Sequence, residues 1–567
     1  MPYRAPLNDY RFIFENVVGF SRVAETERFA EATPELVEQI LTEAARLSEE
    51  VIAPLNWPGD RNPAKLENGV VRTSPGFGDG YKAIAEGGWV GMAANPDHGG
   101  MGLPMAVTTA VNEMLSSACL SLQLCPLLSQ GQIEALEHHA SDELKALYLP
   151  KLTSGEWSGT MNLTEPQAGS DVGALRTKAE PQEDGSYRIT GQKIYITWGD
   201  ADFLPNVVHL VLARLPDAPA GTKGISLFLV PKYLPNEAGE PGEQNDLRVV
   251  SLEEKMGIHA SPTCVMEFDG ATGWLVGGPN KGMAAMFTMM NNARLGVGAQ
   301  GIGVGERAYQ HAVAYAMDRV QGKASGSGAI VEHADVRRML TQMKADLFAA
   351  RSIALMNAVA IDMAAATGEA GWKARAALLT PITKVFGTET GVQVAHEGVQ
   401  IHGGMGFVEE TGAAQFSRDA RITPIYEGTN GIQAMDLVAR KMMDGGEAAF
   451  SLIDEIQSQA EEARASHEAL AQKVWEATEA LRETTEWLAE QEMQDRFAGA
   501  VPYLYAFARV LGGAAHLRAA QKGDAARGAF AAFYIDRLLP EHRALLAQAR
   551  AGAKGLYSIS LDDLTAA

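Results

Sequence analysis

The sequence has few metal-binding or disulfide-forming side chains. Its 567 residues include three cysteines, Cys119, Cys125 and Cys264, and no CxxC pair. This excludes a disulfide framework and a cysteine-based zinc site. Cys119 and Cys125 lie in the apolar stretch 118–128, so we expect free, buried thiols. No HExxH and no GxSxG occurs, so the usual zinc-protease and serine-hydrolase motifs are missing, and no metal site is expected.

Positive charge and long apolar runs are also scarce. Lys and Arg number 48 against 70 Asp and Glu, which gives a net charge of −22. So acidic a surface repels nucleic-acid phosphates and anionic lipids. No run reaches about 18 apolar residues, and the first residues show no basic stretch followed by an apolar one. We therefore predict a cytoplasmic protein with neither a membrane nor a nucleic acid as partner.

The pattern of apolar residues changes along the chain from helical to β and back. Leu36, Ile40, Leu41, Ala44 and Leu47 follow the spacing of one helix face. Short β-type runs begin near residue 158, and helical patterns resume at 281. The fold class predicted is mostly α with a central antiparallel β domain. Its expected parts are a helical domain (1–157), a β domain (158–280), a helical bundle (281–445) and a helical extension (446–567).

Two local patterns have alternative interpretations. Residues 187–190 and 193–197 alternate around Gly191-Gln192, which predicts a hairpin.

Gly296, Gly298 and Gly301 form a literal GxGxxG. A dinucleotide site would need a strand before this motif, but the preceding residues look helical. The glycines are therefore interpreted as small residues that let helices pack closely.

Two loops carry groups suited to ligand binding or catalysis. The segment 161–171 alternates hydroxyls with Pro and Gly, so it could present several hydrogen-bond donors to a ligand, or be a turn-rich entry to the β domain. Glu427 follows an apolar pair and precedes Gly428. In an apolar setting its pKa would rise, which suits a general base for a weakly acidic C–H. Alternatively, Glu427 is only a carboxylate at a helix N-terminus.

Both loops resemble motifs of the acyl-CoA dehydrogenase family, and three further segments do so in the same order. Residues 163–171 resemble T-E-P-x-A-G-S-D, 193–197 resemble K-x-W-I-T, and 254–263 resemble K-M-G-x-x-A-S-x-T. Residues 400–406 resemble Q-x-x-G-G-x-G, and 418–429 resemble R-D followed by I-Y-E-G-T. The order and spacing agree over roughly residues 35–445. The helical–β–helical order is also that of the family.

The resemblance implies that FAD lies between the β domain and the helical bundle. The residues that it assigns to FAD are Met161, Leu163, Thr164, Gly169, Ser170, Tyr195, Thr197, Arg319, Gln400, Gly403, Gly404, Thr429 and Asn430. Thr197 would place its hydroxyl at flavin N5, and Tyr195 replaces the family's tryptophan over the ring. Arg319 would pair with the pyrophosphate. The segment 400–404 would reach the FAD of a neighbouring subunit, so we expect a homo-oligomer. The extra C-terminal helices favour a dimer.

The resemblance makes Glu427 the base that removes the α-proton of an acyl-CoA, while hydride leaves the β-carbon for FAD. Its backbone N–H and an FAD hydroxyl would polarise the thioester carbonyl. Some relatives carry the base at the position that matches Ala293. An alanine cannot act as a base, so Glu427 is the only candidate. The residues assigned to the substrate are Ser170, Asn291, Arg294 and Gly428. At Asn291 the family more often has Asp or Glu.

The first residues and the C-terminal extension of about 120 residues resemble a subgroup of long bacterial members. These act on 3-(methylthio)propanoyl-CoA, in dimethylsulfoniopropionate breakdown, or on ordinary fatty acyl-CoAs. We expect electron-transfer flavoprotein as the electron acceptor. The alternatives are a general fatty acyl-CoA dehydrogenase, an oxidase that passes electrons to oxygen, and a DNA-binding flavoprotein of this fold without turnover. The net charge argues against the last.

Overall fold

The computed structural model describes residues 2–323 and 326–566. The chain divides into two compact units. Unit 1 comprises Met1–Thr42, Pro104–Ser117 and Arg294–Ala567, and unit 2 comprises Glu43–Leu103 and Ala118–Ala293. Each unit therefore collects segments from distant parts of the sequence. The division into four consecutive domains stays a prediction.

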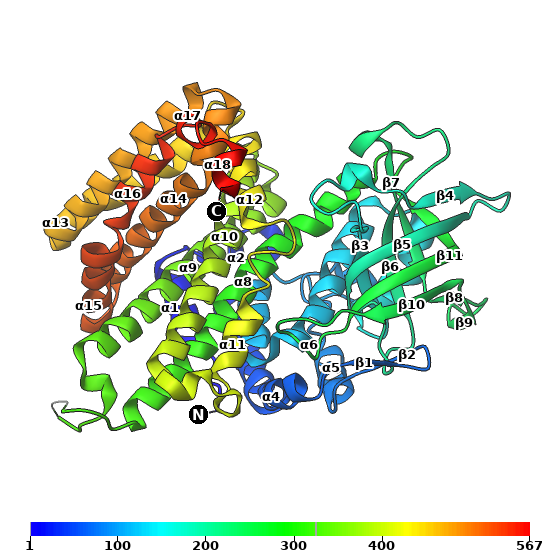
Figure 1. Ribbon diagram of the computed structural model, residues 1–567, viewed down its shortest axis with the longest axis horizontal. Helices are drawn as coiled ribbons and strands as arrows, with labels where there is room; N and C mark the ends of the chain where they lie inside the picture. The colour runs from blue at the N-terminus through cyan, green and yellow to red at the C-terminus, as the bar shows by residue number, and fades with distance from the viewer. Residues whose placement is uncertain (1, 324–325, 567) are drawn as a thin grey trace. The chain divides into compact units, whose positions relative to one another are not determined.

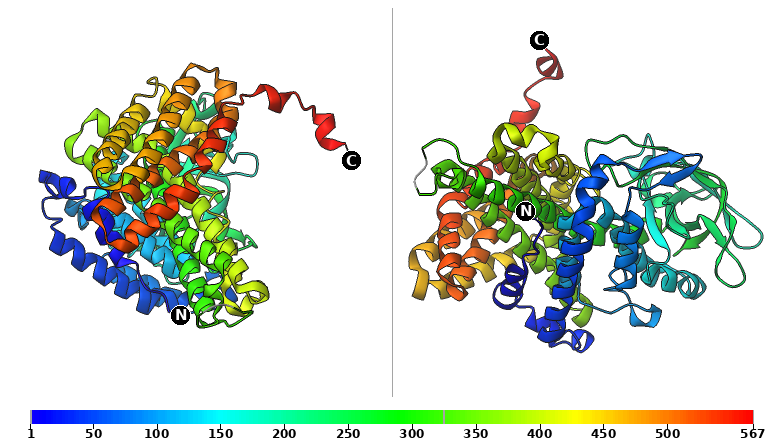
Figure 2. Two further views of the ribbon diagram at one scale, coloured as in Figure 1. Left: turned by 90° about the vertical axis from the view of Figure 1, so that its left-hand side faces the viewer. Right: turned by 90° about the horizontal axis from the view of Figure 1, so that it is seen from below.

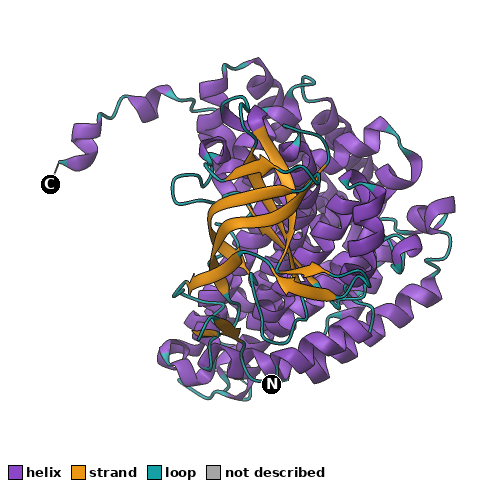
Figure 3. Cartoon of the chain, turned by 90° about the vertical axis from the view of Figure 1, so that its right-hand side faces the viewer, coloured by secondary structure: helices purple, strands orange, loops and turns teal. Residues whose placement is uncertain are grey.

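Unit 2 is built around a twisted sheet (Figure 3). The strands of unit 2 are β1 (Lys65–Glu67), β2 (Val70–Arg72), β3 (Ser158–Asn162), β4 (Lys178–Pro181), β5 (Tyr187–Thr197), β6 (Val207–Arg214), β7 (Ile225–Pro231), β8 (Tyr233–Pro235), β9 (Pro241–Gln244), β10 (Leu247–Leu252) and β11 (Thr263–Val276). Two pairs, β1-β2 and β8-β9, form separate two-stranded sheets. The seven-stranded sheet has the order β10-β11-β5-β4-β6-β3, and β7 pairs with both β11 and β6. Most pairs are antiparallel, as expected, but β6 runs parallel to β3 and β4. Phe228, Met266 and Phe268 fill its core.

The hairpin expected around Gly191 is wrong. Residues 187–197 form the single strand β5, whose register continues along β11 through Gly191 opposite Phe268. A Cβ at Gly191 would lie 2.9 Å from the Cα of Thr177. The glycine is needed because another backbone segment passes close to the strand, and not for a turn.

Helices make up most of the rest of the protein (Figure 1). They are α1 (Leu7–Asn16), α2 (Ser21–Ala24), α3 (Pro34–Leu47), α4 (Ala53–Arg61), α5 (Phe77–Glu86), α6 (Met105–His139), α7 (Asp142–Thr153), α8 (Gly282–Asp318), α9 (Ala334–Thr367), α10 (Ala370–His402), α11 (Ala413–Ala420), α12 (Asn430–Val438), α13 (Glu447–Glu490), α14 (Met493–Lys522), α15 (Ala525–Phe533), α16 (Glu541–Ala549), α17 (Lys554–Tyr557) and α18 (Leu561–Thr565). The predicted helix at 36–47 is α3. In unit 1, α9 packs on α10, and α14 packs on α13 and α16.

Glycines on α8 and α10 let these two helices of unit 1 pack with their backbones in contact. A Cβ at Gly298 would lie 2.9 Å from the carbonyl oxygen of Thr383. One at Gly301 would lie 2.5 Å from the oxygen of Gly387, and one at Gly391 would lie 2.1 Å from that of Gly301. Any larger residue would force the helices apart. The close-packing interpretation of the GxGxxG motif is confirmed.

One helix is apolar enough to resemble a membrane span. Helix α9 has the length and mean hydropathy of a membrane span, although no uninterrupted apolar run is present. In unit 1, however, 83% of its most apolar window is buried. Burial against neighbouring helices accounts for its apolar character, as in the core helix of a folded domain. All three cysteines are free and buried, as predicted for Cys119 and Cys125.

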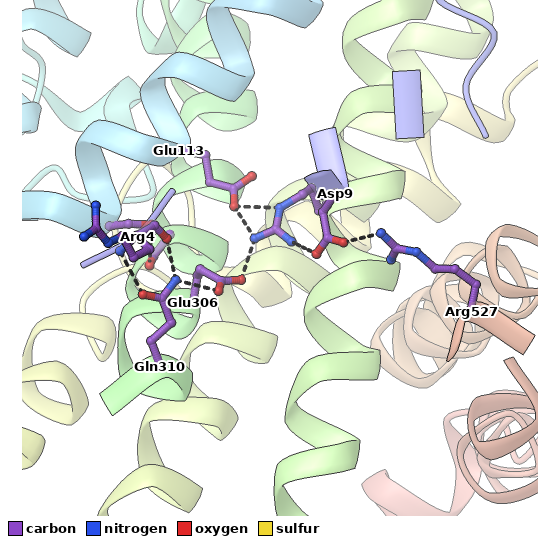
Figure 4. Close-up of polar contacts among 9 residues, drawn as sticks. Arg4, Asp9, Glu113, Glu306, Gln310 and Arg527 are labelled. Carbon is purple, nitrogen blue, oxygen red and sulfur yellow. Dashed lines mark hydrogen bonds and ion pairs between the residues drawn. The ribbon is translucent and has the colours of Figure 1, made fainter. Parts of the chain in front are cut away.

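A buried ionic cluster in unit 1 fixes the N-terminal segment to the helices (Figure 4). Arg351 on α9 is 1% exposed and lies 2.7 Å from Glu113, 2.8 Å from Glu306 and 3.3 Å from Asp9. Asp9, on α1, also pairs with Arg527 on α15. The cluster therefore joins the first helix of the chain to the C-terminal extension.

The last described residues of unit 1 form no part of its core. Helices α17 and α18 run away from the other helices of the unit (Figure 2), and every residue from 554 to 566 is exposed. Ser560 and Asp563 form a capping box that starts α18. This short segment is stabilised locally, and it buries no apolar side chain in unit 1.

Candidate functional site

In unit 2 a buried ion pair holds the predicted ligand loop against β5. The Nζ atom of Lys193, fully buried, lies 2.8 Å from Glu165 and donates to the carbonyl of Leu163 at 3.0 Å. The loop also binds the strand directly, because the N–H of Ile194 donates to the carbonyl of Thr164 at 2.9 Å. The candidate residues Leu163 and Thr164 are thus brought beside the strand that carries Tyr195 and Thr197.

Glu165 is a structural anchor. It accepts hydrogen bonds from the Thr177 hydroxyl at 2.6 Å and from the N–H groups of Arg176 and Thr177 at 2.7 and 3.0 Å. Burial by itself would raise the pKa of its carboxyl, but Lys193 and these donors outweigh burial and lower the pKa to about 2. Glu165 therefore stays ionised at neutral pH, and its side chain is turned away from solvent.

The opposite face of this loop and strand is open. Gly169 and Ser170 are exposed, and a Cβ at Gly169 would meet no other atom within 4 Å. Tyr195 is 60% exposed, which is unusual for a large ring in the middle of a sheet, and its φ is +62°. Thr197 and Met161 are partly exposed. This face offers an aromatic ring, hydroxyls and free space to a flat ligand.

In unit 1 the segment before α12 holds Glu427 in an uncommon conformation. Its φ is +55° and that of Gly428 is +85°, which few non-glycine residues adopt. The Thr429 hydroxyl caps α12 by accepting from the N–H of Ile432 at 3.3 Å. The N–H groups of Glu427 and Gly428 donate to no acceptor among the residues that the structure describes. Strain of this kind is typical of functional sites, and the two N–H groups can bind an oxygen atom.

The carboxyl of Glu427 lies near two cations. Burial raises its pKa to about 7, although the positive charges of Arg294 and Lys384 oppose the rise. Arg294, on α8, is 5% exposed, and its guanidinium lies 3.9 Å from the position of a Cβ at Gly428. Ile425 and Ile432 beside Glu427 are 46% and 38% exposed. A buried carboxylate that titrates near neutrality can act as a general base.

Lys384 was not found in the sequence analysis. It lies on α10, one turn before Gly387, and is fully buried. Its Nζ donates to Asn430 Oδ1 at 2.8 Å, and Asn430 Nδ2 donates to Glu389 at 2.8 Å. Burial lowers the pKa of Lys384 to about 7, against the opposing charges of Glu427 and Glu389. The only sequence signal was a lysine within the otherwise uncharged stretch 376–388.

A second group of predicted residues lies at the other end of α8 and α10. Tyr315 stacks on His402 with ring centroids 4.3 Å apart, so Arg319, one turn later on the chain, lies near the segment 400–404. Arg319, Gln400, Gly403 and Gly404 are all exposed, and a Cβ at either glycine would meet nothing within 4 Å. Gln400 is 16 residues beyond Lys384, or about 24 Å along the helix. Unit 1 therefore carries two separate groups of candidate residues.

The remaining candidates lie on α8. Asn291 is exposed and Ala293 is buried, at 4%. Asn291 belongs to unit 2 and Arg294 to unit 1, although three positions on one helix separate them. Within its own unit the structure places Arg294 near Glu427 and Gly428. No three His, Cys, Asp or Glu side chains gather in a way that could hold a metal ion within residues 2–323 and 326–566.

Four family models match consecutive segments of the chain. They are described as the N-terminal, middle and C-terminal domains of acyl-CoA dehydrogenase, at residues 35–156, 160–271 and 280–443, and as "Acetyl-CoA dehydrogenase C-terminal like", at 452–560. The last match covers most of the C-terminal extension.

Curated relatives match over most of the chain. The 3-methylmercaptopropionyl-CoA dehydrogenase of Ruegeria pomeroyi is 47% identical over 519 residues, 89% of this chain and 88% of the relative. A broad-specificity linear acyl-CoA dehydrogenase of Mycobacterium tuberculosis is 37% identical over 477 residues, covering 80% and 78%. Among solved structures, an acyl-CoA dehydrogenase from Bacillus anthracis complexed with FAD has a TM-score of 0.76 at 22% identity, covering 94% of this chain and 90% of that one.

Proposed function

The chain belongs to the acyl-CoA dehydrogenase family, and we propose that its substrate is 3-(methylthio)propanoyl-CoA or a related short- or medium-chain acyl-CoA. Its activity is the FAD-dependent oxidation of an acyl-CoA thioester, and we propose the trans-2-enoyl-CoA as the product. The observation that carries this proposal is the state of Glu427: its backbone has a positive φ, and burial raises the pKa of its carboxyl to about 7 between Arg294 and Lys384. The relative from Ruegeria pomeroyi supports the methylthio substrate.

Glu427 removes the α-proton in this proposal. The N–H groups of Glu427 and Gly428 have no acceptor among the described residues, and they can bind the thioester oxygen as negative charge develops on it. Arg294 and Lys384 keep part of the Glu427 population ionised despite burial. Tyr195 and Thr197 are among the residues that would hold FAD, and FAD would supply the acceptor for the hydride of the β-carbon. In unit 1, Arg294 and Gly428 are the residues proposed to bind the acyl-CoA. In unit 2, the residues proposed for the same role are Asn291 and Ser170, both exposed.

The residues present fit FAD in both units. In unit 2, Tyr195 offers an exposed ring beside Thr197, and the space next to Gly169 is open. Met161, Leu163, Thr164 and Ser170 complete that group. In unit 1, Arg319, Gln400, Gly403 and Gly404 are exposed together, while Thr429 and Asn430 lie beside Glu427. Open space at three glycines allows the backbone to approach a planar or phosphorylated ligand closely.

A panel of acyl-CoA thioesters tests the substrate. The holoenzyme is mixed without oxygen with 3-(methylthio)propanoyl-CoA, butyryl-CoA, octanoyl-CoA or palmitoyl-CoA, and bleaching of the flavin is followed. We expect bleaching by every substrate that fits, with the highest kcat/KM for the methylthio and butyryl thioesters. If palmitoyl-CoA were at least about tenfold better, the enzyme would be a general fatty acyl-CoA dehydrogenase. If no thioester bleached the flavin, the proposal of dehydrogenase turnover would be overturned.

Electron-transfer flavoprotein is the proposed acceptor of the electrons. Reoxidation of substrate-reduced enzyme should be fast with this protein and slow in air, and stopped-flow measurement separates the two cases. Fast reoxidation in air would instead indicate an oxidase.

A DNA-binding role is disfavoured by the net charge of −22, and a gel shift at low salt tests it. The cytoplasmic location stays a prediction.

We expect the enzyme to be a homodimer. Arg319 and Gln400 lie far along their helices from Lys384 and Glu427, so one chain carries cofactor residues at two separated places in unit 1. A neighbouring copy whose FAD reaches the segment 400–404 accounts for this separation. Light scattering should give a mass about twice the 60.6 kDa of the chain. A monomer that keeps a full complement of flavin would contradict this expectation.

Replacing Lys384 with methionine should shift the pH dependence of turnover to higher pH. The base must be deprotonated, so turnover rises as pH passes the pKa of Glu427, about 7. Lys384 opposes the rise in that pKa, and its removal raises the pKa further. We expect the rising limb of kcat to move upward by about one pH unit. The measurement is kcat from pH 5.5 to 9 with a dye acceptor.

Two further variants separate charge from structure. Lys384→Arg keeps the positive charge and should keep most of the wild-type pH profile. Lys373→Met removes an exposed lysine from the same helix and should change neither the profile nor kcat. If Lys384→Met lowered kcat equally at every pH, its contact with Asn430 would matter only for the position of the loop.

A further inference from the structure

A cavity of about 50 Å³ lies in unit 1, away from the residues assigned to FAD and acyl-CoA. It forms where the end of α1, α2, α9, α10, α13 and α14 meet. Its apolar wall includes Val359, Leu452 and Ile456, all buried, and the small side chains of Ala514 and Ala515 leave the space open. The cavity joins the N-terminal segment, the helical bundle and the C-terminal extension.

Three cations and one anion line this cavity. Arg22, Arg375 and Arg518 come from three different helices, and Glu455 is the single carboxylate. Burial would raise the pKa of Glu455, but Arg375, Arg22 and Arg518 together lower it, so the carboxylate is ionised. The lining has two positive charges in excess. In a chain with a net charge of −22, such a local excess favours an anionic ligand.

Arg375 and Arg518 differ in what they bind. Arg375 forms an ion pair with Glu455, and its guanidinium lies over the ring of Trp372, 5.5 Å from the ring centre. Arg518, partly buried, uses Nε to donate to the carbonyl of Asn16 at 2.7 Å. Its two terminal nitrogens donate to no acceptor among the described residues. A guanidinium with two parallel donors beside an apolar wall matches a carboxylate with a short hydrocarbon chain.

We propose that this cavity binds a short-chain monocarboxylate. The carboxylate pairs with the terminal nitrogens of Arg518, with Arg22 nearby, and the hydrocarbon chain lies along Val359, Leu452 and Ile456. A volume of about 50 Å³ holds roughly four water-sized groups, which limits the ligand to about four to six non-hydrogen atoms. Butyrate is of this size. A longer fatty acid would not fit.

Titration of the holoenzyme with butyrate, followed by isothermal calorimetry, tests the proposal. We expect one site per chain in addition to any weak binding elsewhere, with a Kd on the order of 1 mM for so small a ligand. Butylammonium, which has the same chain and the opposite charge, should not bind. If wild-type enzyme bound no butyrate up to about ten times this concentration, the proposal would be wrong whatever the variants did.

Two variants locate the binding, and one matched variant controls for them. Arg518→Gln removes the cation, and Ala514→Met fills the cavity while keeping all three arginines; each should weaken butyrate binding at least about tenfold. Arg537→Gln removes an exposed arginine from the same extension and should bind like wild type. Circular dichroism and flavin content show whether each variant is folded. Unchanged binding by a folded Arg518→Gln or Ala514→Met variant would place butyrate elsewhere and refute the assignment.

Discussion

Replacing Glu427 with glutamine should abolish turnover and leave a folded, FAD-containing protein. The amide has nearly the size of the carboxyl, and the backbone N–H groups of Glu427 and Gly428 are retained, so acyl-CoA should still bind. An amide cannot accept the α-proton. A positioned base contributes about 10²–10⁴-fold, and here proton removal is obligatory, so the loss should be at least about 10⁴-fold. Anaerobic bleaching of the flavin by substrate should nearly stop.

Two comparisons make this result specific. Glu427→Asp keeps the carboxylate but shortens its reach by one methylene, and misplacement by about 1 Å can cost ~10²-fold, so its rate should lie between those of wild type and Glu427→Gln. Glu369→Gln neutralises an exposed carboxylate in the same unit and should bleach at the wild-type rate. If Glu427→Gln bleached its flavin at close to that rate, Glu427 would be only a carboxylate before a helix, and another residue would be the base.

Local sequence patterns predicted the structural features that depend on residues close together in the chain. The apolar spacing of residues 36–47 predicted α3 because one face of that helix is buried. The GxGxxG glycines were interpreted correctly because their flanking pattern was helical. Gly191 was misinterpreted because a turn and a close contact with a distant backbone both require glycine. Only the structure shows that Thr177 passes beside it.

The motif residues of the site were predictable, and its electrostatic partners were not. Glu427 stood out by its neighbours Ile425 and Gly428, and by the family resemblance. Lys384 precedes Glu427 by 43 positions, and no local pattern links the two. They meet because Asn430, three residues after Glu427, binds Lys384. The pKa of a catalytic group depends on such distant residues, so it could not be derived from the motif alone.

Arg351→Met should destabilise unit 1 by about 3–5 kcal/mol, because it leaves Asp9, Glu113 and Glu306 without their shared cation. Methionine keeps most of the volume, so the effect comes from uncompensated charge. The thermal midpoint, followed by circular dichroism at a fixed heating rate, should fall by about 5 °C at pH 8. Arg338→Met removes a more exposed arginine from the same helix, 44% exposed, and should change the midpoint by less than about 1 °C.

The pH dependence of this loss distinguishes charge from packing. Burial already raises the pKa of Glu113 in the presence of Arg351, and removal of the arginine must raise it further. A carboxyl whose pKa is higher in the folded than in the unfolded state destabilises the fold above that pKa, and the penalty decreases as protons bind at lower pH. The difference between wild type and Arg351→Met should therefore be smaller at pH 5.5 than at pH 8. An equal difference at both pH values would show that Arg351 contributes mainly through packing against Tyr10, whose ring centre lies 5.3 Å from its guanidinium.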